Sequence, residues 1–282
     1  MGGITSMFKY KKVLILTVVL MTGILFVGCN KDANSGGRSK VTVSGSTSVG
    51  AVMEPLVEEY KKTLSNDIDI EVQQVGSSSG IKNTIEGTSE IGMTSRDLKG
   101  DEKESNLVET KIALDAIAVI TNSENDVSNL TKAQVKDIFT GKITNWKEIG
   151  GHDSPIVVVS REDGSGTREG FESIVGYGPE QLVKSALISD GSGNIKTTVA
   201  NNKNAIGYIS LGYVDKSVKG VSIDGVVANS DNVKSHKYSI SRPFLLIYKD
   251  EKISENGNKF IDFILSDEGQ KVVEKHGFVS VN

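Results

Sequence analysis

Cysteine, histidine and proline are scarce in this 282-residue sequence, which contains one, three and four of them respectively. A single cysteine excludes an internal disulfide framework. Scattered histidines, with no acidic cluster at metal-ligand spacing, argue against a metal site, so we expect no metal and no cofactor. The sequence after residue 28 also lacks an excess of positive charge. Three of the 32 basic residues and none of the 36 acidic ones lie in the first 28 positions, so 29 basic residues face 36 acidic ones in the remainder. The acidic remainder argues against a nucleic-acid partner.

The N-terminal segment has the pattern of a bacterial export signal. Lysines at positions 9, 11 and 12 precede an apolar run over 13–27, about 15 residues, which is short for a membrane span and typical of a signal-peptide core. The run ends in LFVGC, which resembles a lipobox whose cysteine, here Cys29, receives diacylglycerol; Phe26 stands where leucine is usual. We predict a signal peptide over residues 1–28 and a lipid on Cys29.

Residues 29–40 are small and polar, which predicts a flexible tether. A lipid and a tether would hold a soluble domain outside the cytoplasm at the cell membrane. An uncleaved membrane anchor is the alternative, and Met7 is an alternative start.

The remaining sequence alternates between strand and helix periods. Residues 68–72 alternate as a strand, whereas Val49, Val52, Met53 and Leu56 recur on one face of a helix. This alternation predicts an α/β fold. The expected strands are 41–43, 68–72, 90–93, 114–121, 156–159, 207–209 and 240–248, and the expected helices are 49–64, 80–86, 132–139, 167–174, 195–200, 256–265 and 267–275.

Three loops rich in Gly, Ser and Thr fall at strand-to-helix junctions: residues 44–48, 76–80 and 163–168. The first N–H groups of a helix lack partners inside the helix, so such loops can hold an oxyanion, and hydroxyls add donors without adding charge. Each loop alone could be an ordinary helix cap. Together they favour one anion site, to which Arg161 could add a guanidinium. Asp163 could orient that guanidinium or cap the helix.

Rival chemistries are poorly matched. Ile81 separates Gly80 from Lys82, so this loop fails the phosphate-binding P-loop pattern, and Ser165 lacks the Gly-x-Ser-x-Gly spacing of a serine hydrolase. The three histidines are expected at the surface, the charge run 99–104 in a solvated loop, and Trp146 in a packing role.

Four motifs, together with the export signal, resemble one family. They are SGSTS (44–48), VGSSSGI (75–81), DIFTGKITNWKEIGG (137–151) and SREDGSGTREGF (160–171). They resemble the PstS family, the phosphate-binding lipoproteins of bacterial phosphate ABC importers, and the likeness covers about residues 40–282. The resemblance implies a two-lobed periplasmic-binding-protein fold of type II with two hinge crossings, near 114–121 and 240–248. Residues 41–117 with 240–282 would form lobe 1, and residues 118–239 lobe 2.

The resemblance also implies a role. The protein would bind inorganic phosphate with high affinity outside the cytoplasm and deliver it to an ABC permease, as a monomer that catalyses nothing. Carried over residue by residue, the family's ligand contacts fall on Thr47, Ser48, Ser77, Arg161, Ser165, Gly166 and Thr167.

Ser95 departs from the family pattern, because many relatives have an aspartate there that accepts the phosphate proton and helps to reject sulfate. We include Ser95 in the site and expect softer discrimination, with Asp163 or backbone carbonyls as a second acceptor. Arg96 would be a further contact or a structural ion pair. The alternatives are a binding protein for sulfate or molybdate, a secreted serine hydrolase using Ser165, and a phosphate sensor or scavenger without a permease.

Overall fold

The computed structural model describes residues 39–63 and 68–282. The signal peptide expected over 1–28, the lipid expected on Cys29 and the tether up to residue 38 lie outside the described residues. Strand β1 begins at Ser39, so the last two residues of the expected tether are part of a strand.

The described residues form a mixed α/β fold, and the predicted fold class is confirmed. The strands are β1 (Ser39–Gly45), β2 (Ile68–Gln74), β3 (Ile91–Thr94), β4 (Val108–Asn122), β5 (Asn129–Leu130), β6 (Val157–Arg161), β7 (Leu187–Ser189), β8 (Ala205–Ser210), β9 (Val218–Gly220), β10 (Ser222–Ile223) and β11 (Ser241–Tyr248). The α-helices are α2 (Thr47–Thr63), α3 (Ser77–Glu86), α4 (Gly100–Lys103), α5 (Lys132–Phe139), α6 (Gly166–Val175), α7 (Gly191–Ala200), α8 (Ser230–Lys234), α9 (Glu255–Leu265) and α10 (Asp267–Lys275). Short 3₁₀ turns are η1 (Trp146–Ile149), η2 (Pro179–Gln181) and η3 (Leu211–Tyr213).

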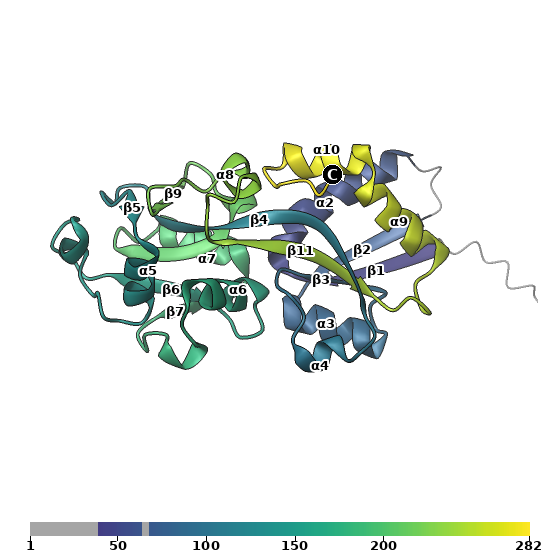
Figure 1. The fold of residues 1–282 in the computed structure, drawn as a ribbon, viewed down its shortest axis with the longest axis horizontal. Coiled ribbons are helices and arrows are strands. Elements are labelled where there is room, and N and C mark those ends of the chain that lie inside the picture. The colour runs from purple at the N-terminus through teal and green to yellow at the C-terminus, as the bar shows by residue number, and fades with distance from the viewer. Residues whose placement is uncertain (1–38, 64–67) are drawn as a thin grey trace, which may run out of the picture. The chain divides into compact units, whose positions relative to one another are not determined.

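Two strands link two groups of elements. The main sheet has the order β2-β1-β3-β11-β4-β8-β6-β7, and the antiparallel neighbours β4 and β11 lie at its centre. Figure 1 shows both strands running from one group to the other. We call the group of β1–β3, α2–α4, α9 and α10 lobe 1, and the group of β5–β10 and α5–α8 with η1–η3 lobe 2.

The core of lobe 1 lies between its sheet and three helices. Val41 and Val43 on β1 point to the same face because strand side chains alternate, and they meet the apolar stripe of α2 and residues of α9 and α10. On β4, Ile112 and Ala113 still belong to this core, whereas Ala116 and Ile117 belong to the core of lobe 2. Each lobe therefore has its own apolar interior, and the changeover falls within a few residues on β4.

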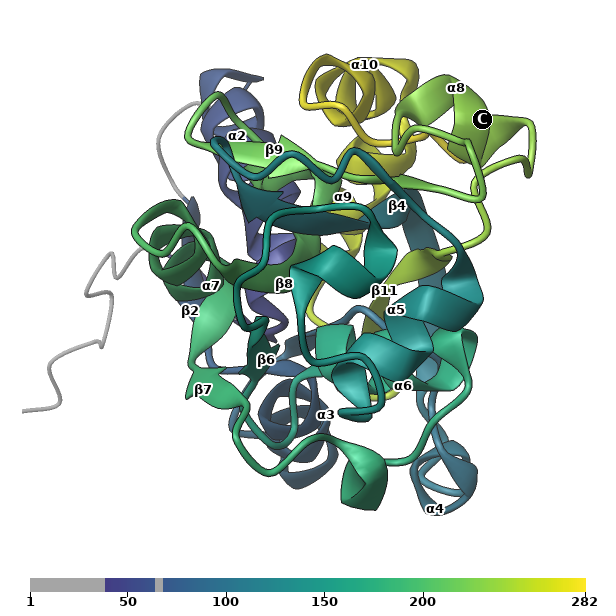
Figure 2. The same ribbon diagram turned by 90° about the vertical axis from the view of Figure 1, so that its left-hand side faces the viewer.

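Lobe 2 buries both faces of its sheet. Ile206 and Tyr208 on β8 pack in the core formed with α5 and α6, and Ala205 and Ile209 pack on the opposite side with α7. Figure 2 shows α7 on one side of β6 and β8 and the pair α5 and α6 on the other. Trp146 is buried in the first of these cores, which confirms its packing role, and its Nε1 donates to the Asn204 carbonyl at 3.0 Å.

Two surface predictions have different outcomes. His152 and His236 are exposed as expected, whereas His276 is partly buried, with Nδ1 2.9 Å from the Val272 carbonyl. The charge run over 99–104 is solvated as predicted, since all its residues except Glu102 are exposed, but the prediction of a loop is wrong. Residues 100–103 form α4, and Glu102 accepts two hydrogen bonds from the buried Arg96 because that guanidinium needs a carboxylate where water is excluded.

Candidate functional site

The glycine- and hydroxyl-rich loops lie at the carboxyl ends of parallel strands. Strands β1, β2 and β3 are parallel, so the loops that follow them share one edge of the sheet in lobe 1. Strands β6, β7 and β8 form the corresponding parallel set in lobe 2. The two edges face each other, as one hydrogen bond between them shows: the Ser78 N–H of lobe 1 donates to the Gly164 carbonyl of lobe 2 at 3.1 Å.

A buried hydroxyl cluster fills the space between these edges. Within lobe 1, the Ser46 Oγ donates to the Ser95 Oγ at 3.0 Å, and the Ser77 Oγ lies 3.3 Å from the Ser95 Oγ. Across the lobes, the Ser48 Oγ lies 2.8 Å from the Thr167 Oγ1 and 3.1 Å from the Ser192 Oγ. We define the hydroxyl cluster as Ser46, Thr47, Ser48, Ser77, Ser95, Thr167 and Ser192.

Arg161 brings positive charge to the cluster. It ends strand β6, its side chain is 1% exposed, and its Nη2 and Nη1 donate to the Thr47 Oγ1 at 3.2 Å and the Ser192 Oγ at 3.3 Å. Its Nε and Nη2 also donate to the Glu162 carboxylate, each at 2.6 Å. Burial acts to raise the pKa of Glu162, but the hydrogen bonds and charge of Arg161 outweigh it and lower that pKa. Glu162 is therefore ionised near neutral pH.

Packing in lobe 2 fixes the strand end that carries Arg161. The Tyr208 hydroxyl on β8 is 2.8 Å from the Ser160 Oγ and accepts from the Arg161 N–H at 3.4 Å. Burial raises the pKa of Tyr208 to about 12, so it stays a neutral hydroxyl. Phe171 of α6 stacks on the Tyr208 ring with centroids 3.9 Å apart, which places the start of α6 beside Arg161.

Four helices begin at this cluster. The first residues of α2, α3 and α6 are Thr47, Ser77 and Gly166, and α7 begins one residue before Ser192. Each N-terminus adds N–H groups that have no partner inside their own helix, and the positive end of a helix dipole. Gly166 permits the close approach, since a Cβ there would collide with the Ser77 and Ser95 hydroxyls. The cluster is thus a buried, donor-rich space suited to an oxyanion.

The structure brings the predicted site residues to one place. Thr47, Ser48, Arg161 and Thr167 contact one another directly or through Ser192. Ser77 and Ser95 lie against each other, and Gly166, the neighbour of Thr167 in the chain, lies against both of their hydroxyls. Ser165 lies in the same loop, but its hydroxyl is the N-cap of α6 and accepts the Arg168 N–H at 3.3 Å.

Ser192 and Glu162 were missed by the sequence analysis. A signal for Ser192 exists, because Asp190-Gly191-Ser192-Gly193 repeats the four letters of Asp163-Gly164-Ser165-Gly166. The strand before it, β7, has only three residues, too few to show a periodic pattern, so the junction was not recognised. Ser46 was part of the first loop but was given no role.

Asp163 does not orient Arg161, and it does not cap α6. Its side chain is 97% exposed and forms an ion pair with Arg168 at 2.7 Å, whereas Glu162 binds Arg161. This exposed position also disfavours Asp163 as the expected second acceptor of the phosphate proton. Arg96 is a structural ion-pair residue, since its guanidinium binds Glu102 of lobe 1 and Glu169 of lobe 2.

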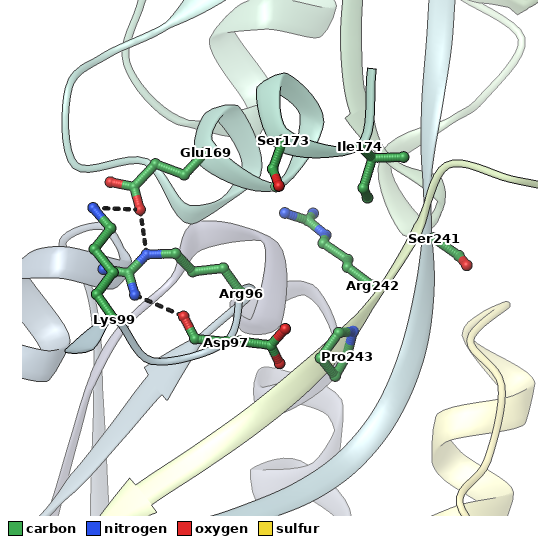
Figure 3. A pocket seen from close by; sticks show the side chains of 10 residues that line it. Arg96, Asp97, Lys99, Glu169, Ser173, Ile174, Ser241, Arg242 and Pro243 are labelled. Atoms are coloured by element: carbon green, nitrogen blue, oxygen red, sulfur yellow. Dashed lines mark hydrogen bonds and ion pairs between the residues drawn. The ribbon is translucent and has the colours of Figure 1, made fainter. Parts of the chain in front are cut away.

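An open cavity of about 310 Å³ lies beside Ser95 of the hydroxyl cluster. Figure 3 shows Arg96 and Lys99 from lobe 1 converging on Glu169 of α6, with Arg242 and Pro243 of β11 along the other wall. The Lys99 Nζ lies 2.9 Å from the Glu169 carboxylate. We call Arg96, Lys99 and Glu169 the interlobe ion triad; it joins the lobes next to the site.

Among residues 39–63 and 68–282, no group of three His, Cys, Asp or Glu side chains is arranged to hold a metal ion. No helix in the described part of the chain is long and apolar enough to cross a membrane.

Comparison with known proteins identifies the family. A model of the PBP superfamily domain matches residues 30–268. The phosphate-binding protein PstS of Bacillus subtilis (strain 168) is 32% identical over 291 residues, which cover 96% of this chain and 95% of that protein. The chain belongs to the PstS family. PstS of Borreliella burgdorferi is 28% identical, over 96% of this chain and 99% of that protein.

Solved structures of PstS relatives share the fold. A phosphate ABC transporter substrate-binding protein with bound phosphate from Clostridium perfringens is 58% identical with a TM-score of 0.85, covering 86% of this chain and all of that one. An ABC-type phosphate transport receptor from Vibrio cholerae is 38% identical with a TM-score of 0.72, at the same coverage. The PstS chain described here therefore has the two-lobed periplasmic-binding-protein fold, with β4 and β11 as its two crossings.

Proposed function

We propose that this PstS-family protein binds inorganic phosphate between its lobes and delivers it to an ABC permease. The observation that carries the proposal is the buried hydroxyl cluster, which joins both lobes, adjoins Arg161 and lies at four helix N-termini. Relatives whose names state phosphate binding match nearly the whole chain, which supports the same ligand.

The chemistry of the cluster suits a tetrahedral oxyanion. Hydroxyls that now bond to one another can turn their donors toward phosphate oxygens, and the guanidinium can add a charge-assisted pair. Glu162 balances the charge of Arg161, so neutral donors and helix dipoles supply much of the attraction. A hydroxyl can also accept, which lets the site meet the proton that phosphate retains near neutral pH.

The site is complete only when the lobes are together, because its hydroxyls come from both lobes. Ligand binding between them favours the closed state by the ligand's differential affinity for that state, and the closed form is the one a permease would recognise. We propose the limits 41–117 with 240–282 and 118–239 for the moving lobes. The separate apolar cores support a division into two lobes, although the core of lobe 2 already includes Ala116 and Ile117, just before the proposed limit.

We further propose that the protein is a monomeric, lipid-anchored binding protein outside the cytoplasm and not an enzyme. The lipobox-like segment ending at Cys29 supports the anchor. A hydrolase using Ser165 is disfavoured, because that hydroxyl caps α6 and the histidines at 152 and 236 are exposed.

Isothermal titration of the purified, phosphate-free protein with phosphate and with sulfate tests the proposal. We expect one phosphate per chain and weaker binding of sulfate. Tighter binding of sulfate would replace phosphate by another oxyanion as the ligand. Absence of binding to either anion would overturn the proposed function.

A further inference from the structure

A buried ion pair joins the two crossing strands next to the hydroxyl cluster. Asp115 lies on β4 and Arg242 on β11, and their side chains are 0% and 2% exposed. The Arg242 Nη2 and Nε donate to the Asp115 Oδ2 at 3.0 and 3.2 Å. The pair thus lies where both strands pass between the lobes.

The arginine reaches the loop that follows β3 in lobe 1. Its remaining nitrogen, Nη1, donates to the Ser95 carbonyl at 3.3 Å. A guanidinium can do this while it pairs with a carboxylate, because its donors diverge in a rigid plane. The backbone of Ser95 is therefore tied to β11, and its hydroxyl lies in the cluster.

Asp115 is connected to the first loop, residues 44–48, through the 3₁₀ turn η3 of lobe 2. Its Oδ1 accepts the Ser210 Oγ at 2.9 Å and the Leu211 N–H at 3.1 Å, which holds the start of η3. Tyr213 ends η3, and its hydroxyl donates to the Thr47 carbonyl at 2.9 Å. One carboxylate thus connects to a loop of the cluster on each side, through Arg242 to Ser95 and through η3 to Thr47.

Stability alone does not account for such a pair. Removing two charges from water costs several kcal/mol per ion in general, and well-packed apolar residues often replace a buried pair without loss. Burial raises the pKa of Asp115 to about 6 even though Arg242 lies beside it, which shows how strongly the site disfavours the charge. What an apolar pair could not supply is the directed set of hydrogen bonds to η3 and to Ser95.

We infer that Asp115 and Arg242 form a positioning pair for phosphate, which sets the places of Ser95 and Thr47 in the closed site. The inference rests on the proposed function and adds to it residues outside the cluster. Neither residue touches the cluster hydroxyls in the contacts described, so their effect on binding would pass through Ser95 and η3.

Two variants test the inference. Arg242→Lys keeps a charge for Asp115, but a single ammonium cannot reproduce the fork that also reaches Ser95. Tyr213→Phe removes only the hydroxyl that reaches Thr47, introduces no unpaired charge, and should fold normally. In isothermal titration we expect phosphate affinity to fall at least tenfold in Arg242→Lys and about three- to tenfold in Tyr213→Phe, with one phosphate still bound per chain.

The control is Glu90→Gln, at the opposite end of lobe 1, where Glu90 accepts from the Ser254 N–H and hydroxyl. It should bind phosphate as the wild type does. A merely structural defect would lower the fraction of active protein or the melting temperature. Displaced site groups would instead change the phosphate-to-sulfate affinity ratio at full stoichiometry, and we expect this change in Arg242→Lys.

Wild-type affinity and an unchanged ratio in Tyr213→Phe and in folded Arg242→Lys would overturn the inference and leave the proposed function intact. If Arg242→Lys does not fold, wild-type behaviour of Tyr213→Phe alone would overturn it. A wild-type protein that binds neither anion would overturn the proposed function and the positioning pair with it.

Discussion

At Gly166 two serine hydroxyls of lobe 1 fill the space that a side chain would occupy. An added Cβ would collide with the Ser77 and Ser95 hydroxyls, whereas one at Gly193, the matching glycine of the repeated Asp-Gly-Ser-Gly sequence, would meet no atom within 4 Å. We expect Gly166→Ala to weaken phosphate binding at least tenfold, because the lobes could not approach as closely. Gly193→Ala should bind normally and melt at the same or a higher temperature. Equal affinities of the two variants would show that contact at Gly166 is unimportant for closure.

The hydroxyl of Ser95 should affect the selectivity of the site between phosphate and sulfate. Its buried hydroxyl bonds to Ser46 and lies near Ser77, so it can accept a proton or donate one. We expect Ser95→Ala to cost about 1 to 3 kcal/mol of phosphate binding free energy and to affect sulfate less. Titration of the wild type and of Ser95→Ala with phosphate and with sulfate measures these differences. A variant in which neither affinity changes would place Ser95 outside the ligand's reach.

Side-chain roles were predictable where a loop motif carried them. The hydroxyl loops and Arg161 could be assigned because family motifs include them, whereas the partner of Arg161 could not. Asp163 and Glu162 are adjacent carboxylates, and only the backbone direction after β6 decides which one faces the guanidinium. Ser192 remained hidden because its loop follows a very short strand.

Helix and strand types were predicted better than their ends. α10 matches its predicted bounds, but α2, α3 and α7 begin earlier than predicted because hydroxyl and glycine residues were assigned to loops. This error matters, since these early residues are the helix N-termini that form the site. β4 is longer than predicted because its first residues lie partly exposed and lack a continuous apolar run.

Helix α6 carries a prediction about closure. Glu169 reaches Arg96 and Lys99 of lobe 1, and this pairing requires the lobes to be together. We expect Glu169→Gln to weaken phosphate binding about three- to tenfold, because the closed state loses an ion pair that the open state lacks. Glu124→Gln is the control, since the exposed pair of Glu124 with Lys203 lies within lobe 2. Unchanged affinity in Glu169→Gln would mean that the interlobe ion triad does not affect the balance between the open and closed states.

At the scale of the whole molecule, periodicity alone could not predict the two crossings. β4 and β11 are separated by more than a hundred residues of sequence, and nothing in either strand encodes its partner. The arrangement followed from the family motifs, and the PstS relatives confirm the fold. The local α/β alternation, by contrast, follows from the apolar pattern.

The anchor leads to a prediction about location. If Cys29 carries the lipid, Cys29→Ser should move the protein from the membrane fraction to the soluble fraction while phosphate affinity stays the same. Fractionation of cells followed by titration of the released protein measures both properties. Continued membrane association of the variant would instead indicate an uncleaved apolar anchor over residues 13–27.

The most direct measurement for the central claim is phosphate titration of Arg161→Ala against the wild type. Arg161 is buried, and its guanidinium contacts hydroxyls of both lobes. Losing it should cost about 2 to 4 kcal/mol of binding free energy, a roughly 30- to 900-fold weaker affinity, while an exposed hydroxyl variant, Thr88→Ala, binds as the wild type does. Wild-type affinity in folded Arg161→Ala would contradict a phosphate site at the hydroxyl cluster.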